Sequence, residues 1–448
     1  MLAPLVVVKM LWAAALVLAY IVLCVAVYWQ YRRRHSPVMV APKTWLIAYA
    51  TQTGYAHHLA QHTAKTLRLA GLSVQELPLA QLTAAMLQQA EQLLLIVSTY
   101  GNGEAPDSAR LFVRRVMAQA LPLTGLRYGL LALGSRHYPQ FCAFGGELDA
   151  WLQTQGAQAY FDYIRVDNSD KQAISLWGNA IAECTHCQNV MPDAWQQSAF
   201  SSWIIQSQEL LNPNSLGAPV YYLQLTPVNP SHETWQAGDL IQLHINDQQP
   251  LRDYSIANVT SDHIALLVRL QYRPEGGYGL GSGLLTQSAL GTEVALRIRH
   301  NPSFHIANNQ HRPLILIANG IGLAGVLAHL RQRVLQASAR PCWLIFGERQ
   351  RAVDYFCQQE LEQYQSQGLL ARVDVVFSRD GESLRYVQDV LMAQASELQQ
   401  WLTQDAAIYV CGSLQGMAQA VDDALKDIIG QQQLDMLSQE GRYQRDVY

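Results

Sequence analysis

Three apolar segments, each followed by a loop rich in Gly, Thr or Tyr and then by a helical pattern, constrain the fold most. They are WLIAYATQTGYAHHLAQHTAKTL from residue 45, QLLLIVSTYGNGEAPDSARLF from residue 92 and YGLLALGSRHYPQFCAFGGELDAWL from residue 128. Short buried strands that alternate with helices predict a doubly wound α/β domain with a parallel sheet. Because ligands of such sheets bind at the carboxyl ends of the strands, the three loops are expected to share one site.

The first of these loops has the composition of a phosphate site, and the other two carry aromatic residues. Hydroxyl and backbone N–H groups at a helix start suit a phosphate, although a structural turn explains the first loop equally well when it stands alone. No Gly-Lys-Ser/Thr follows, so this is not a Walker loop. One phosphate loop with two aromatic loops predicts an FMN pocket, whereas a single tyrosine is more often core packing. The candidate FMN-site residues are Thr51, Gln52, Thr53, Gly54, Ser98, Thr99, Tyr100, Gly101, Gly103, Gly134, Tyr138 and Phe141.

After residue 200 the pattern changes to strands with Gly and Pro punctuation, such as PVYYLQLTPV and DLIQLHI, which predicts an antiparallel β-barrel. Within LRDYSIANV, Arg252 offers a guanidinium fork to a pyrophosphate, Tyr254 can pack against a ring, and the Ser255 hydroxyl could reach a flavin N5. The later GYGLGSGLLT supplies small residues that let the backbone approach a diphosphate. Together these segments resemble the FAD site of the ferredoxin–NADP reductase superfamily. Its candidates are Arg252, Tyr254, Ser255, Gly279, Gly281 and Ser282.

A second glycine-rich turn lies in RPLILIANGIGLAGVLAHLRQR, between a buried strand and a helix. Gly320, Gly322 and Gly325 fit the dinucleotide pattern G-x-G-x-x-G, which is a weak signal when it occurs alone. Arg349 and Arg351 follow the next strand, where basic residues suit a 2′-phosphate better than a free 2′-hydroxyl. A solvated face is the alternative for each basic residue taken singly.

Residues 44–182 resemble the flavodoxin-type domain of the diflavin reductases, the family of cytochrome P450 reductase and the sulfite reductase flavoprotein. The resemblance extends to the carboxyl terminus, where RYQRDVY closely matches the end of the sulfite reductase flavoprotein. It implies that Thr51 and Thr53 hold the FMN phosphate. It also implies that Tyr100 and Tyr138 flank the isoalloxazine.

The same resemblance implies the residues of a hydride-transfer site. Cys411 lies beside the nicotinamide, Tyr448 stacks on the FAD ring, and Asp446 orients Ser255 and Cys411. An inert buried thiol is the alternative for Cys411. Leu384 stands where the family usually has lysine, with Arg385 beside it. The residues implied to hold the NADP 2′-phosphate and adenine are Ser378, Arg379, Tyr386 and Gln388.

The resemblance implies an NADPH-dependent diflavin oxidoreductase of the NADPH–hemoprotein reductase type. Its cofactors are FMN, FAD and NADPH, and electrons pass from NADPH to FAD, to FMN and then to a haem or iron-containing acceptor protein. The alternative is a non-catalytic flavin-binding module for redox sensing or for assembly of a membrane complex. A net charge of −4 lacks the basic excess of a nucleic-acid-binding protein, and no metal site is predicted.

The segment between AGDLIQLHI and LRDYSIAN departs from the family, which usually inserts a helical connecting domain there. Here only NDQQP remains, which predicts a tight turn. The FMN domain would then be positioned by its linker and by direct contact alone. It is therefore expected to be mobile.

The amino-terminal residues 10–31 contain no charged residue and are long enough to cross a bilayer core of roughly 30 Å. Arg32, Arg33 and Arg34 follow, so the carboxyl side is expected to be cytoplasmic. This pattern predicts a single-pass protein of the cell inner (plasma) membrane, with the lipid bilayer as a partner and a membrane acceptor. A cleavable signal peptide and a buried core helix are the alternatives.

Six segments follow from these interpretations. They are a transmembrane helix (10–31), a tether (32–43), a flavodoxin-like FMN-binding domain (44–182), a linker (183–200), an FAD-binding β-barrel (201–311) and an NADP-binding α/β domain (312–448).

Overall fold

The computed structural model describes residues 43–51, 54–100, 103–168, 170–185, 199–229, 233–246, 249, 251–260, 262–338 and 340–448. The predicted transmembrane helix, residues 10–31, lies outside these ranges, as does the tether up to residue 42. Among the described residues, no helix combines the length and the apolar character needed to cross a membrane. This finding contradicts the predicted inner-membrane localisation, so neither a bilayer nor a membrane acceptor is retained as a partner.

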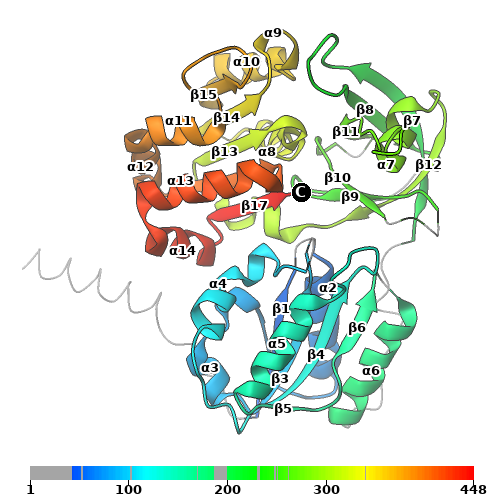
Figure 1. Ribbon diagram of the computed structural model, residues 1–448, viewed down its shortest axis with the longest axis vertical. Helices are drawn as coiled ribbons and strands as arrows, with labels where there is room; N and C mark the ends of the chain where they lie inside the picture. The colour runs from blue at the N-terminus through cyan, green and yellow to red at the C-terminus, as the bar shows by residue number, and fades with distance from the viewer. Residues whose placement is uncertain are drawn as a thin grey trace, which may run out of the picture.

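The first sheet is parallel, with the strand order β2-β1-β3-β4-β5 and with β6 paired to β4. Helices cover both of its faces (Figure 1), so the predicted doubly wound α/β unit is confirmed. The elements are β1 (Trp45–Ala50), α2 (Tyr55–Leu69), β2 (Val74–Pro78), η1 (Leu79–Gln81), α3 (Ala84–Gln89), β3 (Gln92–Ser98), η2 (Asp107–Ala109), α4 (Arg110–Phe112), η3 (Val113–Met117), β4 (Arg127–Gly134), α5 (Ala143–Thr154), β5 (Gln158–Ala159), β6 (Ile164–Asp167) and α6 (Lys171–Thr185).

Strand β1 shows why this sheet needs two layers of helices. Leu46 and Ala48 belong to the apolar core on the side of α5, whereas Trp45 and Ile47 belong to the core on the side of α2 and α6. Every residue of the run is therefore apolar, as expected of a parallel strand buried on both faces. On the α2 side, the indole of Trp177 in α6 donates a hydrogen bond to Thr63 Oγ1 at 3.2 Å, which fixes the two helices to each other.

The second sheet is antiparallel, with the order β10-β9-β12-β7-β8-β11. A bridge between Ile256 and Leu266 joins the two ends of this path, so the sheet closes around an apolar interior that contains Trp203 and Trp235. Strands β9 and β10 pair directly with each other, so the short NDQQP segment connects two neighbouring strands. The elements are β7 (Ser201–Leu210), β8 (Val220–Pro227), β9 (Leu240–His244), β10 (Arg252–Ser255), β11 (Ile264–Arg269), α7 (Leu280–Gln287) and β12 (Glu293–Arg299).

The third sheet is parallel, with the order β15-β14-β13-β16-β17, and its topology switches direction between β13 and β16. Ligands of such sheets bind outside the carboxyl ends of the strands at this switch point. The elements are η5 (Pro302–Phe304), η6 (Ala307–Asn309), β13 (Leu314–Asn319), η7 (Gly320–Gly322), α8 (Leu323–Leu335), β14 (Cys342–Glu348), α9 (Arg351–Asp354), α10 (Gln358–Ser366), β15 (Leu370–Phe377), α11 (Val387–Ala393), α12 (Ala395–Thr403), β16 (Ala407–Gly412), η8 (Leu414–Ala418), α13 (Gln419–Ile429), α14 (Gln431–Gln439) and β17 (Tyr443–Val447).

A buried carboxylate, Asp239, ties the start of β9 to the segment that leaves β12. Its two oxygens accept hydrogen bonds from the rings of His300 (2.9 Å) and His305 (2.5 Å) and from the backbone N–H of Asn301 (2.8 Å). Burial alone would raise the pKa of Asp239, but the bonds from the two histidines outweigh it and hold that pKa well below its usual value. The 300–305 segment is therefore fixed to the start of β9.

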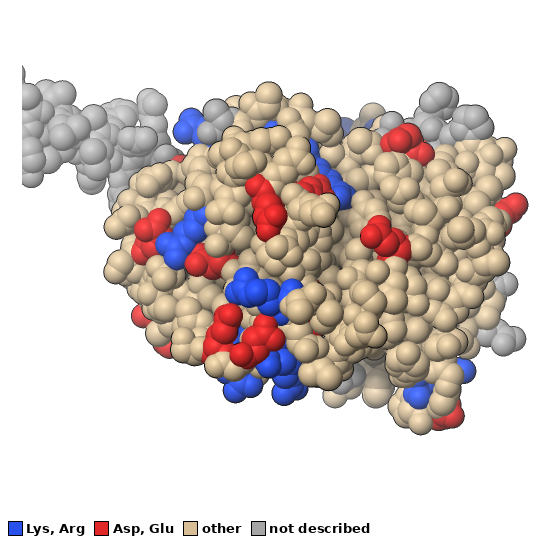
Figure 2. Space-filling model, turned by 90° about the horizontal axis from the view of Figure 1, so that it is seen from above, with Lys and Arg blue, Asp and Glu red and all other residues tan. Residues whose placement is uncertain are grey.

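The face of the molecule seen from above carries acidic and basic side chains that are intermixed, and most of this face is uncharged (Figure 2). Intermixed charges produce little long-range field of either sign. Among the described residues of this face, no extended basic stripe that would suit a nucleic-acid backbone is visible.

Candidate active site

The first candidate site lies at the carboxyl edge of the parallel sheet, between β1 and β3. Thr51 follows β1 and Thr99 follows the neighbouring strand β3, so the two residues leave the sheet side by side. Their hydroxyl oxygens are both buried and have no hydrogen-bond partner among the described residues. Buried polar groups are normally paired, so two orphaned hydroxyls at this edge fit a ligand with phosphate oxygens.

Most of the remaining FMN-site candidates lie at or near this edge, but not all of them face it freely. Ser98, Tyr100, Gly134 and Tyr138 lie at the same edge, with the Tyr138 side chain 46% exposed, and Gly54 precedes α2 with a φ of 86°. Gly103 packs against the Gln140 side chain, which a Cβ on the glycine would meet at 2.3 Å. Phe141 lies against Gly134 and below the Arg136 guanidinium instead of standing free. Gln52, Thr53 and Gly101 are outside the described residues.

The second candidate site combines β10 with the start of α7. A Cβ on Gly281 would lie 2.7 Å from the Tyr254 hydroxyl and 3.0 Å from Cγ of Arg252, so only glycine permits this approach. The cradle fits a diphosphate held by backbone and by Arg252. Gly279 precedes the helix, but the Ser282 hydroxyl accepts from the Gln271 N–H at 3.1 Å and thus has a partner within the protein.

Three side chains from distant parts of the chain converge at the switch point of the third sheet. The Ser255 hydroxyl donates a hydrogen bond to Asp446 Oδ2 at 3.1 Å, and Cys411 Sγ lies 3.8 Å from the same oxygen. Cys411 and Asp446 are register partners on the parallel strands β16 and β17. The sequence prediction that these three residues lie together agrees with this geometry.

Burial controls the ionisation of this cluster. It raises the pKa of Asp446 to about 6, and the hydrogen bond from Ser255 opposes that shift only partly. Burial, reinforced by the nearby Asp446, raises the pKa of the Cys411 thiol well above its usual value. At neutral pH the cluster therefore holds the Asp446 carboxylate next to the Ser255 hydroxyl and the Cys411 thiol, which both keep their protons.

Tyr448 follows β17 and borders a cavity of about 700 Å³. Its backbone is fixed on both sides, because its N–H donates to the Gly412 carbonyl at 3.0 Å and its own carbonyl accepts from Leu414 at 2.8 Å. The side chain, in contrast, is 49% exposed. A fixed backbone with a free ring suits an aromatic residue that covers a flat ligand and can swing away from it.

The cavity brings together most of the residues predicted to bind NADP. Gly320, Arg349, Ser378, Tyr386 and Gln388 line it. Arg379 is not among the described residues that line it, and Arg385, whose guanidinium donates to the Ser378 carbonyl at 3.1 Å, takes that place. The basic lining fits a phosphate-bearing dinucleotide.

Sequence reasoning missed two features of this cavity. One is an ion pair between Arg269 of the barrel and Glu348 at the end of β14. The other is the Asn319 side chain, which accepts a hydrogen bond from the Ser413 N–H at 2.9 Å. Neither was detectable, because each partner comes from a different strand and no local pattern connects them.

The glycines of the G-x-G-x-x-G match mainly allow close packing. A Cβ on Gly322 would lie 2.2 Å from the Cys411 carbonyl, and one on Gly325 would lie 2.9 Å from Cys411 Sγ. Helix α8 can therefore approach β16 only because both residues lack a side chain. This contact places the N-terminal end of α8 next to the cysteine.

The two flavin-site candidates meet at β17, which lies between the two halves of the molecule in Figure 1. The Tyr100 hydroxyl donates to the Val447 carbonyl at 2.9 Å, and Arg445 Nε lies 3.0 Å from Asp107 Oδ2. Nearby, a Cβ on Gly54 would lie 2.2 Å from the His300 carbonyl, so the first loop touches the segment held by Asp239. The edge that carries Tyr100 thus faces the strand that ends in Tyr448.

Comparison with known proteins gives two matching families and several relatives. The family described as Flavodoxin matches residues 47–177, and the Oxidoreductase NAD-binding domain matches residues 316–423. The sulfite reductase [NADPH] flavoprotein alpha-component of Neisseria meningitidis serogroup C is 25% identical over 543 positions, covering 91% of this chain and 90% of the relative. The Vibrio cholerae protein of the same name is 26% identical over 535 positions, covering 90% and 87%.

The alignment lengths show that the relatives are longer. Because 91% of 448 residues is about 408, roughly 135 of the 543 aligned positions have no residue of this chain. The flavodoxin match precedes the NAD-binding match along this chain, and the likeness to the two relatives covers nearly the full length of the chain. The chain therefore belongs to the diflavin reductase family.

Proposed function

We propose that this NADPH-dependent diflavin oxidoreductase delivers electrons one at a time to a haem or iron-containing acceptor protein. Its cofactors are FMN, FAD and NADPH. The observation that supports this proposal most is the position of β17, which carries Asp446 and leads into Tyr448 at one site and contacts Tyr100 of the other. Two flavin sites joined by one strand suit a chain of electron carriers better than a module that only binds flavin.

The residue roles are part of the proposal. Thr51, Thr99 and the N–H groups before α2 hold the FMN phosphate, and Tyr100 and Tyr138 flank its ring. The cradle of Arg252, Tyr254 and Gly281 holds FAD under Tyr448. Residues 44–182, 201–311 and 312–448 form the FMN-, FAD- and NADP-binding domains. The NADP site consists of Gly320, Gly322, Arg349, Ser378, Tyr386 and Gln388, with Arg385 in the place predicted for Arg379.

A bound nicotinamide would supply a hydride, and two bound flavins would pass its two electrons on singly. Asp446 keeps a buried negative charge at this site, which would stabilise the positive charge that develops on a hydride donor in the transition state. Ser255 donates to this carboxylate and fixes its orientation. Burial keeps Cys411 a thiol, so it neither titrates nor competes as a nucleophile at neutral pH.

Flavin analysis and reduction by NADPH test the proposal together. Purified protein should contain FMN and FAD, NADPH should bleach both, and cytochrome c should then be reduced. Protein that binds both flavins but is not bleached by NADPH would instead support the non-catalytic module. The finer assignment as an NADPH–hemoprotein reductase depends on which acceptor is reduced fastest.

Deletion of Tyr448 should relax the preference for NADPH over NADH. Displacement of this ring by the nicotinamide costs binding free energy, which other contacts of the dinucleotide must offset. The 2′-phosphate, which only NADPH carries, provides such contacts. Without the ring, the ratio of kcat/KM values for NADPH and NADH should fall by at least about tenfold. A truncated protein that keeps the wild-type ratio would show that Tyr448 does not cover the nicotinamide site. Tyr448→Trp, which retains an aromatic lid, is the matched control.

A further inference from the structure

Two consecutive arginines of the flavodoxin-like unit bind a single carboxylate of the NADP-binding unit. Arg114 forms an ion pair with Asp435, and Arg115 Nη2 lies 2.8 Å from the other oxygen of that carboxylate. Both arginines lie in the π-helical turn η3, which continues α4, and both reach the same carboxylate although they are consecutive in sequence. Within the part of the chain that the structure describes, neither arginine pairs with an acid of its own unit.

Asp435 depends on these arginines in turn. Its side chain is 8% exposed and accepts a hydrogen bond from the Gln431 amide at 2.8 Å. Among the described residues, its cationic partners are only Arg114 and Arg115. Asp422 differs, because Lys426 of the same helix lies 2.9 Å away while Arg110 lies at 3.8 Å. The contact at Asp435 is therefore basic on the flavodoxin-like side and acidic on the other.

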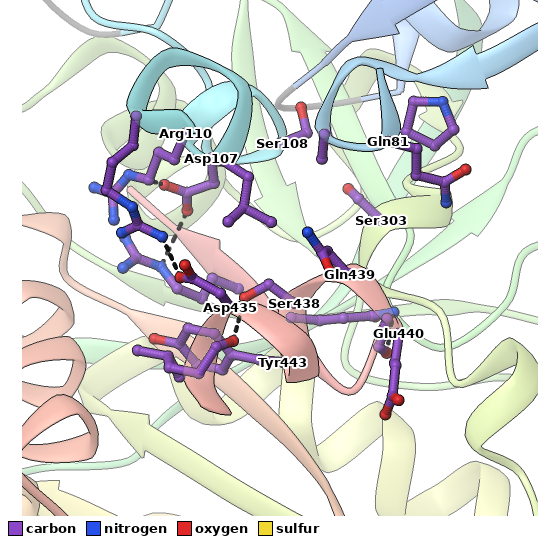
Figure 3. Close-up of a pocket in the computed structure, with 18 of the residues that line it drawn as sticks. Gln81, Asp107, Ser108, Arg110, Ser303, Asp435, Ser438, Gln439, Glu440 and Tyr443 are labelled. Carbon is purple, nitrogen blue, oxygen red and sulfur yellow. Dashed lines mark hydrogen bonds and ion pairs between the residues drawn. The ribbon is translucent and has the colours of Figure 1, made fainter. Parts of the chain in front are cut away.

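Figure 3 shows Asp435 on the same side of the pocket as Asp107 and Arg110 of the flavodoxin-like unit. Arg110, Arg114 and Arg115, which we call the arginine ridge, directly follow the loop that carries Tyr100 and Asp107. The ridge thus borders the edge from which an electron has to leave this unit.

The same edge has to serve two partners in turn. In this structure the edge faces the rest of the chain, since Tyr100 contacts Val447 and Asp107 contacts Arg445. An acceptor protein can approach only when that contact opens. The ridge then loses Asp435, and two half-exposed guanidinium groups are left to water or to a new anion.

We propose that the acceptor protein docks through an acidic patch whose carboxylates replace Asp435 on the arginine ridge. This inference rests on the proposed function and specifies the chemistry of the partner. Guanidinium groups bind carboxylates in a fixed, often bidentate geometry, so the ridge selects position as well as charge. Asp107, the acidic residue next to the ridge, lies 3.0 Å from Arg110 of its own unit, which offsets its charge.

Binding of oxidised protein to two haem probes, without turnover, tests the proposal. Cytochrome b5 is the acidic probe and cytochrome c the basic one. The wild-type chain should bind cytochrome b5 more tightly, and the affinity should fall as salt is added. Arg114→Glu with Arg115→Glu should raise the Kd for cytochrome b5 at least about tenfold and improve binding of cytochrome c.

A second variant separates docking from folding. Asp435→Asn leaves the ridge intact but removes its competitor within the chain, so cytochrome b5 should bind several-fold more tightly. Lys65→Glu with Arg68→Glu changes the same amount of charge at the far end of α2, on exposed residues, and is the matched control. Loss of binding in this control as large as in the ridge variant would overturn the proposal. So would unchanged cytochrome b5 binding in the ridge variant or in Asp435→Asn, or tighter wild-type binding of cytochrome c.

Bleaching of the flavins by NADPH in the same samples distinguishes a failure of the proposed function from a failure of the inference about the partner. If wild-type flavin is not bleached, the proposed function fails. If it is bleached but binding of the acidic probe is independent of the ridge, only the inference about the partner fails.

Discussion

Replacement of Asp446 by Asn lowers the rate constant of flavin reduction by NADPH about 100-fold, the loss expected when one preorganised electrostatic group is removed from a transition state. The amide keeps the size of the side chain and can still accept from Ser255, but it carries no charge. Stopped-flow absorbance measures the step directly, because flavin bleaching precedes any acceptor. A variant that bleaches as fast as the wild type would remove Asp446 from the hydride-transfer site.

The pH profile gives an independent test of the same residue. Burial raises the pKa of Asp446 to about 6, so the carboxylate is charged above this pH and protonated below it. The wild-type rate constant should therefore fall as the pH drops through about 6, whereas that of Asp446→Asn should be flat there. Glu440→Gln, an exposed change of equal charge near the same terminus, is the control and should keep both the rate and the profile.

Replacement of Asp239 by Ala lowers the free energy of unfolding by about 3–5 kcal/mol, because the donors that converge on this buried carboxylate lose their charged acceptor. His300, His305 and the Asn301 N–H all lose a hydrogen bond at once. For domains of this size the melting temperature should fall by about 10 °C. The FMN unit should also dock less firmly, since the released segment is the one that touches Gly54. A melting temperature within a degree of the wild type would contradict this assignment.

The pH dependence of this effect has a definite sign. The pKa of Asp239 is held below its value in the unfolded chain, so its contribution is fully present above about pH 4. As the pH falls through the folded-state pKa, the carboxylate is protonated and the contribution is lost. The difference in stability between the wild type and Asp239→Ala should therefore shrink in acid. Asp253→Ala removes an exposed pair with Arg299 and should cost no more than about 1 kcal/mol.

Much of the fold could be predicted from the sequence because its strands are buried on both faces. Strands β1, β3 and β4 appear as unbroken apolar runs, and each ends in a loop whose composition marks the carboxyl edge of the sheet. The barrel was detectable only from its Gly and Pro punctuation. Nothing local, however, encodes its closure through Ile256 and Leu266. The predicted membrane localisation was wrong, since no described helix supports it.

The candidate site was predictable to a smaller extent. Ser255 and Asp446 are 191 residues apart, and only resemblance to a family, not their spacing, placed them together. Arg379 was expected at the NADP cavity, but the turn before α11 presents Arg385 there instead. The pairing of Arg114 and Arg115 with Asp435 had no sequence signal. Contacts between separately folded units depend on how surfaces meet, and hydrophobic periodicity does not report that.

Strand β17 has a consequence for the speed of the whole enzyme. It holds the ring of Tyr448 at one end, and its backbone and Arg445 are contacted by Tyr100 and Asp107 of the other flavin unit. Docking strong enough to make internal electron transfer fast also delays the opening that an outside acceptor requires. Turnover should therefore pass through a maximum at an intermediate ionic strength. At low ionic strength the two units stay docked, and at high ionic strength they separate.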